Sequence, residues 1–395
     1  MKPDRPRTAC AAAAQDEADQ RRRREIVRSL TRWFARSARD LPWRREPMPG
    51  RRDPWASLVS ELMLQQTQVA RVLEKFPEFM ARFPTPTHLA RADEHDVLAA
   101  WSGLGYYRRA RLLHAAAKSI VERFGGAVPE NPDDLRSLPG VGRYTAGAVA
   151  SIVFGLGEPI VDGNVSRVLL RLRGLEQSPA DAADWCWEEA TALALAAGKH
   201  VGVFNEGLME LGALVCTPRT PSCGQCPLAD GCEAFARGLT DRIPAPKPPA
   251  ARKGLTAHSV VVLSPGGKVL VERRPAKGLW AGMWQTPTLE VPRDASDEAP
   301  LFQHPPADLL SLLGLGFASL ESSPPTTFSH ATTHRDVLFV VWHARCARAA
   351  AAGKDRSWIS PADVAGLALA NPQRRIIEAA FSPSPRRHGS SVRGG

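Results

Sequence analysis

The run LPGVGRYTAGAVASIVFG, residues 138–155, decides the fold of the first half of the chain. Its glycines allow a tight turn, and apolar residues at helical spacing lie on both sides. Such a turn leaves the first N–H groups of the second helix unpaired, and these groups bind phosphate. An ordinary helix connector is the alternative. The residues of the predicted phosphate-binding turn are Leu138, Pro139, Gly140, Val141 and Gly142.

The chain is long enough for two domains. Its 395 residues exceed the usual size of one hydrophobic core, and 44% of them are hydrophobic. Helical spacing throughout 25–238 predicts an all-α domain, and alternation within 258–381 predicts an α+β domain. The proline-rich stretch 239–257 is expected to be a linker, 1–24 a disordered basic leader and 382–395 a disordered tail. Strands are expected at 258–264, 267–274 and 336–344, and short helices near Ala307 and Gln373.

The charge of the chain favours a polyanionic partner. The net charge is +10 and comes mostly from arginine, whose planar fork suits phosphate. A compositional bias toward arginine and alanine is the alternative. No apolar run approaches the roughly 18 residues that span a bilayer, and the N-terminus lacks the apolar core of a signal peptide. We therefore expect a protein of a reducing, intracellular compartment, without a membrane partner. We also expect a monomer and a bacterial, cytoplasmic location.

Four of the seven cysteines cluster within residues 216–232. They form the pattern Cys216-x6-Cys223-x2-Cys226-x5-Cys232, directly after the helix-like run 204–215. Thiolates at this spacing bind zinc or an iron–sulfur cluster. The sequence therefore predicts a metal-binding loop packed after a helix.

The run PWASLVSELMLQQTQVARVLEKF, residues 54–76, predicts a helix that is apolar almost all round near Glu61. Burial there favours the protonated carboxyl group, as a general acid requires. An ion pair with a core arginine is the alternative. Gln65 and Gln66 follow on the same helix, where their amides need partners, either from a nucleic-acid base or from the protein core.

A second carboxylate opens another predicted helix, in VDGNVSRVLLRL, residues 161–172. Asp162 and Asn164 are both able to cap the first N–H groups of this helix, and capping alone would explain them. If Asp162 faces the same cavity as Glu61, the pair would suit glycoside cleavage. One acid would protonate the leaving group, and one carboxylate would stabilise the sugar cation.

Together, the turn LPGVG, the segment VDGNV and the cysteine pattern resemble the helix-hairpin-helix DNA glycosylase superfamily with a [4Fe–4S] cluster. The runs SELMLQQTQV (60–69) and GLGYYRRAR (103–111) resemble its MutY-type branch. The resemblance covers about residues 25–380. It implies a base-excision-repair enzyme that hydrolyses the bond to adenine opposite 8-oxoguanine or guanine in double-stranded DNA.

The resemblance also implies residue roles. Glu61 would protonate adenine, Asp162 would stabilise or attack the sugar cation, and Asn164 would hold the local geometry. Tyr144 would line the site, in the slot where bifunctional relatives carry a lysine, so a monofunctional enzyme is expected. The residues placed around the extruded base or at the gap it leaves are Trp43, Arg44, Gln66, Tyr106 and Glu206. MPGRR (48–52) lies as an insertion between Arg44 and Glu61, which makes the assignment of Trp43 and Arg44 less direct.

The C-terminal domain resembles a Nudix module through GLWAGMWQTP (278–287) and TTFSHATTH (326–334). Phe328, Ser329 and His330 would form a loop that reads 8-oxoguanine. A hydrolytic Nudix enzyme also needs a helix of the form R-E-x-x-E-E, and residues 258–381 contain none. This module is therefore expected to bind rather than to hydrolyse.

Three other functions compete with this interpretation. A bifunctional endonuclease III-like glycosylase/lyase is disfavoured by Tyr144 and by the extra domain. A Nudix pyrophosphohydrolase fused to a DNA-binding domain is disfavoured by the missing glutamate helix. A DNA-binding or electron-transfer protein, with Glu61 purely structural, stays open.

Overall fold

The computed structural model describes residues 5–46, 52–246, 252–294, 304–351, 353 and 355–382, with the backbone alone over 5–15. The chain divides into two compact units. The first comprises Met1–Ala92 and Arg108–Pro248, and the second comprises Asp93–Tyr107 and Pro249–Gly395. An all-α unit and an α+β unit confirm the predicted multidomain architecture.

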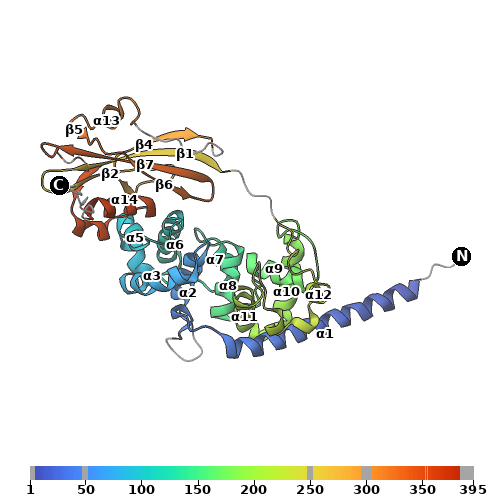
Figure 1. Cartoon of the computed structure of the whole chain (residues 1–395). Helices are drawn as coiled ribbons and strands as arrows, with labels where there is room; N and C mark the ends of the chain where they lie inside the picture. The colour runs from blue at the N-terminus through green and yellow to red at the C-terminus, as the bar shows by residue number, and fades with distance from the viewer. Residues whose placement is uncertain are drawn as a thin grey trace, which may run out of the picture. The chain divides into compact units, whose positions relative to one another are not determined.

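The regular elements described in the first unit are all helices (Figure 1). The α-helices are α1 (Arg5–Ser37), α2 (Pro54–Leu64), α3 (Val69–Arg82), α4 (Pro86–Arg91), α6 (Arg108–Phe124), α7 (Pro132–Arg136), α8 (Arg143–Phe154), α9 (Gly163–Leu172), α10 (Ala183–Ala197), α11 (Val201–Leu214) and α12 (Glu233–Ala236). The 3-10 turns are η1 (Pro42–Arg44), η2 (Gly198–His200), η3 (Cys223–Gln225) and η4 (Ala229–Gly231). None of the described helices is both long and apolar enough to cross a membrane.

The predicted disorder of residues 1–24 is wrong for residues 5–24, which belong to α1. Two of its basic side chains, Arg22 and Arg23, have partners in the body of the unit. Arg22 donates to the carbonyl of Leu172 at the end of α9, at 2.6 Å, and Arg23 forms an ion pair with Glu189. These contacts hold the helix where composition alone indicated a solvated leader. Residues 1–4 lie outside the described part.

Glycines allow the helices around the site to approach closely. A Cβ at Gly147 on α8 would lie 2.3 Å from the carbonyl oxygen of Pro159. A Cβ at Gly212 on α11 would lie 2.8 Å from the Cβ of Asn164. Since real Cβ atoms do not sit this close to neighbours, larger residues would push the chains apart. Gly212 thus lets the start of α9 lie directly against α11.

The second unit contains an eight-stranded mixed sheet. Its strands are β1 (Lys253–Leu263), β2 (Val269–Arg273), β3 (Trp284–Gln285), β4 (Thr288–Arg293), β5 (Ala318–Leu320), β6 (Thr326–Ala331), β7 (Arg335–Cys346) and β8 (Arg356–Ile359). Its helices are α5 (Glu94–Ala100), α13 (Leu309–Leu312), η5 (Pro361–Gly366) and α14 (Asn371–Phe381). The predicted strands and short helices are confirmed as β1, β2, β7, α13 and α14.

Apolar residues cover both faces of this sheet. β1 and β7 run parallel, in a register from Lys253 opposite Arg335 to Leu263 opposite Arg345. Val261 packs into one apolar cluster, and Val260 packs into another. Successive strand residues point to opposite faces, so each face has its own core. This explains why β1 is buried almost without interruption.

The predicted linker 239–257 is too long at both ends. Leu239 and Ile243 are buried in the core of the first unit. At the other end, β1 begins at Lys253, where it pairs with β7. The prolines and cations of this stretch predicted a solvated linker. The buried apolar residues at its start and the strand pairing at its end make the actual linker shorter. Residues 247–251 and 383–395, the latter most of the predicted tail, lie outside the described part.

Candidate active site

One cavity of about 540 Å³ in the first unit brings most of the predicted site residues together. This volume lies within the range of about 300–1,000 Å³ that is typical of small-molecule sites. The predicted residues that line it are Trp43, Arg44, Glu61, Gln66, Tyr144, Asp162, Asn164 and Glu206. They come from η1, α2, the turn after α2, α8, the start of α9 and α11. The fold therefore assembles them from positions more than 160 residues apart.

Glu61 lies on α2, which begins with a well-formed cap. Asp53 accepts hydrogen bonds from the backbone N–H groups of Trp55 and Ala56, at 2.8 and 3.2 Å. Burial raises the pKa of Glu61 to about 7, and the charges of Asp162 and Glu206 act in the same direction. Hydrogen bonding with Tyr144 and the charge of Arg44 oppose the shift. A carboxylic acid with this pKa can hold and release a proton at neutral pH.

Asp162 is the N-cap of α9. Its side chain accepts the N–H of Val165 at 2.7 Å, and the Asn164 amide donates to its other oxygen at 3.3 Å. Burial raises the pKa of Asp162, while these hydrogen bonds and the charge of Arg167 favour the ionised form. The carboxylate is therefore both a cap and a lining group of the cavity that contains Glu61.

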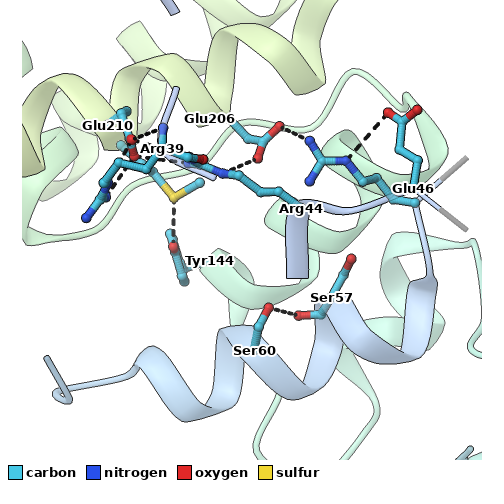
Figure 2. Close-up of polar contacts among 10 residues, drawn as sticks. Arg39, Arg44, Glu46, Ser57, Ser60, Tyr144, Glu206 and Glu210 are labelled. Atoms are coloured by element: carbon cyan, nitrogen blue, oxygen red, sulfur yellow. Dashed lines mark hydrogen bonds and ion pairs between the residues drawn. The ribbon is translucent and has the colours of Figure 1, made fainter. Parts of the chain in front are cut away.

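Tyr144 lies in the first turn of α8 and lines the cavity between the two acids' helices. Its hydroxyl donates to the sulfur of Met209 at 3.0 Å (Figure 2). Burial raises the pKa of Tyr144 well above its ordinary value, and the charges of Glu61 and Asp162 raise it further. The phenol thus stays protonated at neutral pH.

Sequence analysis missed a chain of alternating charges along one wall of the cavity. Arg44 donates through Nε to Glu206 at 3.0 Å and through Nη2 to Glu210 at 3.0 Å. Figure 2 shows Arg44 reaching both glutamates. Arg39 also pairs with Glu210 at 2.8 Å, and Arg52 pairs with Glu206 at 3.0 Å. We call these five residues the charge ladder.

The ladder keeps the buried carboxylate of Glu210 ionised. Burial alone would raise the pKa of Glu210, but hydrogen bonds from Arg39 and Arg44 outweigh it and lower the pKa to about 2. Two glutamates one turn apart on the apolar helix α11 are a sequence signal that cationic partners must exist. No sequence pattern indicated which arginines these would be.

The end of α2 places two glutamines at the cavity. Gln66 has a left-handed backbone, with φ 56°, which is uncommon for a residue with a side chain. Gln65 donates from Nε2 to the hydroxyl of Thr145 at 3.2 Å, so its amide is bound within the protein. Arg109 donates to the carbonyls of Leu62 and Met63 and stabilises this helix end. The role of Arg109 was also missed from the sequence.

The predicted hairpin turn lies between α7 and α8. Leu138 and Val141 are buried, and the N–H of Val141 closes the turn on the carbonyl of Leu138 at 3.1 Å. Gly140 has φ 81°, a conformation that favours glycine. Gly142 is the N-cap of α8 and has no side chain that could pair with the first N–H groups of this helix.

Tyr106 belongs to the other unit and does not line the cavity. Its hydroxyl lies 3.0 Å from that of Thr333, and its backbone is left-handed with φ 48°. Its neighbour Tyr107 donates to the carbonyl of Leu369 at 2.8 Å. The segment Asp93–Tyr107 thus packs with the sheet unit, although it precedes α6 of the helical unit in sequence.

Phe328, Ser329 and His330 form part of strand β6 rather than the predicted loop. They pair with Phe339, Leu338 and Val337 of β7. This pairing makes side chains alternate, so Phe328 and His330 are half-buried while Ser329 is exposed. Phe328 stacks on Phe339, with centroids 5.0 Å apart, and the guanidinium of Arg375 lies 4.3 Å from its ring.

The four clustered cysteines lie in and around η3 and η4, and all are free thiols. The pKa of Cys226 is raised to about 11, mainly by burial, and charge on Cys216, Cys232 and Cys223 acts in the same direction, so the four thiols are near neighbours. Such mutual repulsion among thiolates is relieved by a bound metal centre. In the described part, no three His, Cys, Asp or Glu side chains are spaced to hold a single metal ion.

Two buried arginines of α9 hold the cysteine loop. Arg171 donates to the carbonyls of Thr217 and Pro218 at 2.7 and 2.9 Å, and its Nη1 lies 3.4 Å from the sulfur of Cys216. Arg167 donates to the carbonyl of Cys216 at 2.8 Å. Residues of one helix therefore contact both the cysteine loop and the cavity.

Three segments match known protein families. Residues 59–188 match the HhH-GPD superfamily base excision DNA repair protein model. Residues 216–232 match the iron-sulfur binding domain of endonuclease III, and residues 258–379 match the NUDIX domain. These matches include part of the cavity lining, the whole cysteine pattern and most of the sheet, and they indicate an iron–sulfur cluster at the four cysteines.

Curated relatives share one name. The adenine DNA glycosylase of Homo sapiens is 37% identical over 311 residues, which are 66% of this chain and 57% of the human protein. That of Mycobacterium tuberculosis (strain CDC 1551 / Oshkosh) is 47% identical over 207 residues, 51% of this chain and 64% of that protein. The chain thus spans less than two thirds of the length of either. That of Buchnera aphidicola is 31% identical over 263 residues, 66% of this chain and 73% of that protein. With this extent of similarity, the chain belongs to the adenine DNA glycosylase family.

Proposed function

We propose that this protein is a monofunctional DNA glycosylase that removes adenine mispaired with 8-oxoguanine or guanine from double-stranded DNA. The observation that carries this proposal is the shared cavity of Glu61 and Asp162, in which burial raises the pKa of Glu61 to about 7. Two carboxyl groups with different environments supply an acid and an anion for glycoside cleavage.

The reaction follows from this pair. The extruded adenine enters the cavity, because chemistry on a base requires its removal from the stack. Glu61 gives its proton to the base as the bond to the sugar breaks, and the bonding electrons leave with the adenine. Asp162, held by Val165 and Asn164, faces the resulting oxocarbenium ion. Water then adds to the sugar and loses a proton, leaving an abasic site.

Tyr144 supports hydrolysis without strand cleavage. A lyase needs an amine that forms a Schiff base with the sugar, and the phenol in this slot cannot form one. The test is to incubate excess protein with a duplex pairing adenine with 8-oxoguanine. Strand breaks are expected only after alkali treatment. Efficient nicking before alkali would favour the bifunctional alternative.

The substrate is tested by base release from duplexes that pair adenine with 8-oxoguanine, guanine or cytosine. Release is expected from the first two and not from the third. The salt concentration must be stated and held constant, because phosphate contacts make the affinity for DNA strongly salt-dependent. Release at equal rates from all three duplexes would contradict the proposal. Phosphate contacts are proposed at the hairpin Leu138–Gly142, where the first N–H groups of α8 are uncapped.

We further propose that the four cysteines hold a [4Fe–4S] cluster. The donor set is all thiolate, which suits iron–sulfur chemistry, and Arg171 braces the loop against α9. The cluster would shape the loop that carries Arg219. Purified protein is expected to be brown and to contain about four irons. A colourless protein with only zinc would overturn this assignment.

The sheet unit is proposed to recognise 8-oxoguanine through Ser329, with Phe328 and His330 on the adjoining positions of β6. The stacking of Phe328 between Phe339 and Arg375 supports this proposal, because it holds the strand rigidly. Ser329→Ala is expected to reduce discrimination between 8-oxoguanine and guanine without changing the fold. Measurable hydrolysis of free nucleotides would instead favour a Nudix hydrolase.

A further inference from the structure

The insertion MPGRR ends in Arg52, which is a member of the charge ladder. Arg52, which precedes the N-cap Asp53 of α2, donates from Nη2 to Oε2 of Glu206 at 3.0 Å. Its side chain is 17% exposed and lines the cavity. Its Nε lies 3.9 Å from Glu46, on the other side of the insertion. Segment 44–52 therefore brings arginines from both its ends to one carboxylate of α11.

Arg44 alone does not satisfy Glu206. Its Nε binds Oε1 of Glu206, whereas its two terminal nitrogens donate to Glu210. Without Arg52, Oε2 of this buried carboxylate would lose its charged donor, which is unfavourable for a buried acceptor. The carboxylate would then be free to rotate toward another donor.

We propose that Arg52 is a positioning residue for Glu206, and that the guanidiniums of Arg44 and Arg52, one on each carboxylate oxygen, fix the rotation of this carboxylate toward the extruded base. Each carboxylate oxygen has two acceptor sites, so one hydrogen bond on each oxygen leaves room for the base. The inference rests on the proposed function, because it assigns Arg52 to the handling of the extruded base in the same cavity.

A purely structural role makes a different prediction. If Arg52 only ties segment 44–52 to the unit, its loss should weaken DNA binding and stability along with the rate. If it positions Glu206, its loss should slow base release and leave the affinity for DNA nearly unchanged. Its effect should also disappear once Glu206 itself is changed.

The experiment compares Arg52→Ala, Arg52→Lys and Glu206→Gln, singly and combined, in the full chain. Single-turnover adenine release is measured beside the dissociation constant for a duplex with a non-cleavable adenine analogue. Arg52→Ala is expected to slow release roughly 10- to 100-fold, with less than about a threefold change in affinity. Arg52→Lys should recover most of the rate. In the Glu206→Gln background, Arg52→Ala should add less than about a twofold change.

Arg45 provides the matched control. It is the neighbouring arginine of the same segment, 72% exposed and 3.7 Å from the exposed Asp40. Arg45→Ala removes the same charge and should leave both rate and affinity near those of the unchanged protein. The inference is overturned if Arg52→Ala matches this control, or if its effect on the rate is undiminished in the Glu206→Gln background. If the unchanged protein releases no adenine from any duplex, the proposed function fails instead.

Discussion

Arg167 and Asn164 are joined by a hydrogen bond of 2.9 Å that connects the cysteine loop to the cavity. The same guanidinium donates to the carbonyl of Cys216, and Asn164 donates to Asp162. The route from the cysteine loop to the proposed catalytic anion therefore runs through two side chains of α9. A displacement of Cys216 would therefore shift Arg167 and Asn164, and through them the side chain of Asp162.

Replacing Arg167 with alanine is expected to affect both ends of this route. It would leave the carbonyls of Cys216 and Gly212 without their donor, so the free energy of unfolding should fall by about 2–4 kcal/mol. Denaturant unfolding measures this loss, and visible absorption reports retention of the cluster. Arg136→Ala, at an exposed ion pair with Asp133, is the control and should change neither. Normal stability and cluster content in Arg167→Ala would contradict the bridge.

Glu61→Gln tests the acid directly. The amide keeps the shape of the side chain but cannot donate the proton, so adenine release should slow by about 10²–10⁴-fold. The affinity for the duplex should stay nearly the same, as measured by fluorescence anisotropy. Glu74→Gln, at an exposed position of α3, controls for the loss of charge. Excision at the unchanged rate in Glu61→Gln would reject the acid role.

The rate of excision should fall as the pH rises through about 7, where Glu61 loses its proton. The free energy of unfolding should also depend on pH through the ionisation of Glu61. Its pKa is raised on folding, so the folded state binds more protons, and stability declines between pH 4.5 and about 7. Glu61→Gln removes this dependence and should be more stable than the unchanged protein at pH 8, by up to about 3 kcal/mol. Unfolding curves at pH 5 and pH 8 test this; parallel pH dependence in both proteins would contradict it.

The contribution of Glu210 to stability should depend on pH in the opposite direction to that of Glu61. The pKa of Glu210 is lowered to about 2, so its contribution is full above its ordinary pKa of 4.5 and is lost as the pH falls toward 2. Glu210→Gln leaves Arg39 without its anion and Arg44 with Glu206 alone, and should cost about 2–4 kcal/mol at pH 7. The cost should shrink at low pH. Equal destabilisation at pH 7 and pH 3 would show that shape rather than charge matters here.

Gly212→Ala tests the close packing of α9 on α11. The added Cβ would lie 2.8 Å from that of Asn164, so α9 must shift and carry Asp162 with it. A loss of about 1–3 kcal/mol in stability is expected, together with slower excision. Gly157→Ala is the control, because a Cβ there meets no atom within 4 Å. If both variants behave alike, the contact does not position the anion.

The spacing of residues along the chain was enough to predict the features that depend on neighbours in sequence. The hairpin Leu138–Gly142, the apolar helix around Glu61 and the four cysteines each carry their signal within about twenty residues, because turns, helix faces and metal loops are local structures. The strands β1, β2 and β7 also followed from their apolar patterns. By contrast, α1 was misjudged from composition, since its arginines have partners about 150 residues or more away.

What the sequence determined by itself was the identity of the chemical groups, namely two acids, a glycine-rich turn between two helices and a loop of four cysteines. Only the tertiary structure decided how they are arranged around one cavity. Arg44 and Arg52 reach Glu206 across 162 and 154 residues, and Tyr106 packs with the sheet unit rather than at the cavity. Burial turns an ordinary glutamate into an acid with a pKa of about 7, and burial is a property of the packed molecule. Long-range pairing and desolvation have no local spacing, and for this reason they could not be predicted from the sequence.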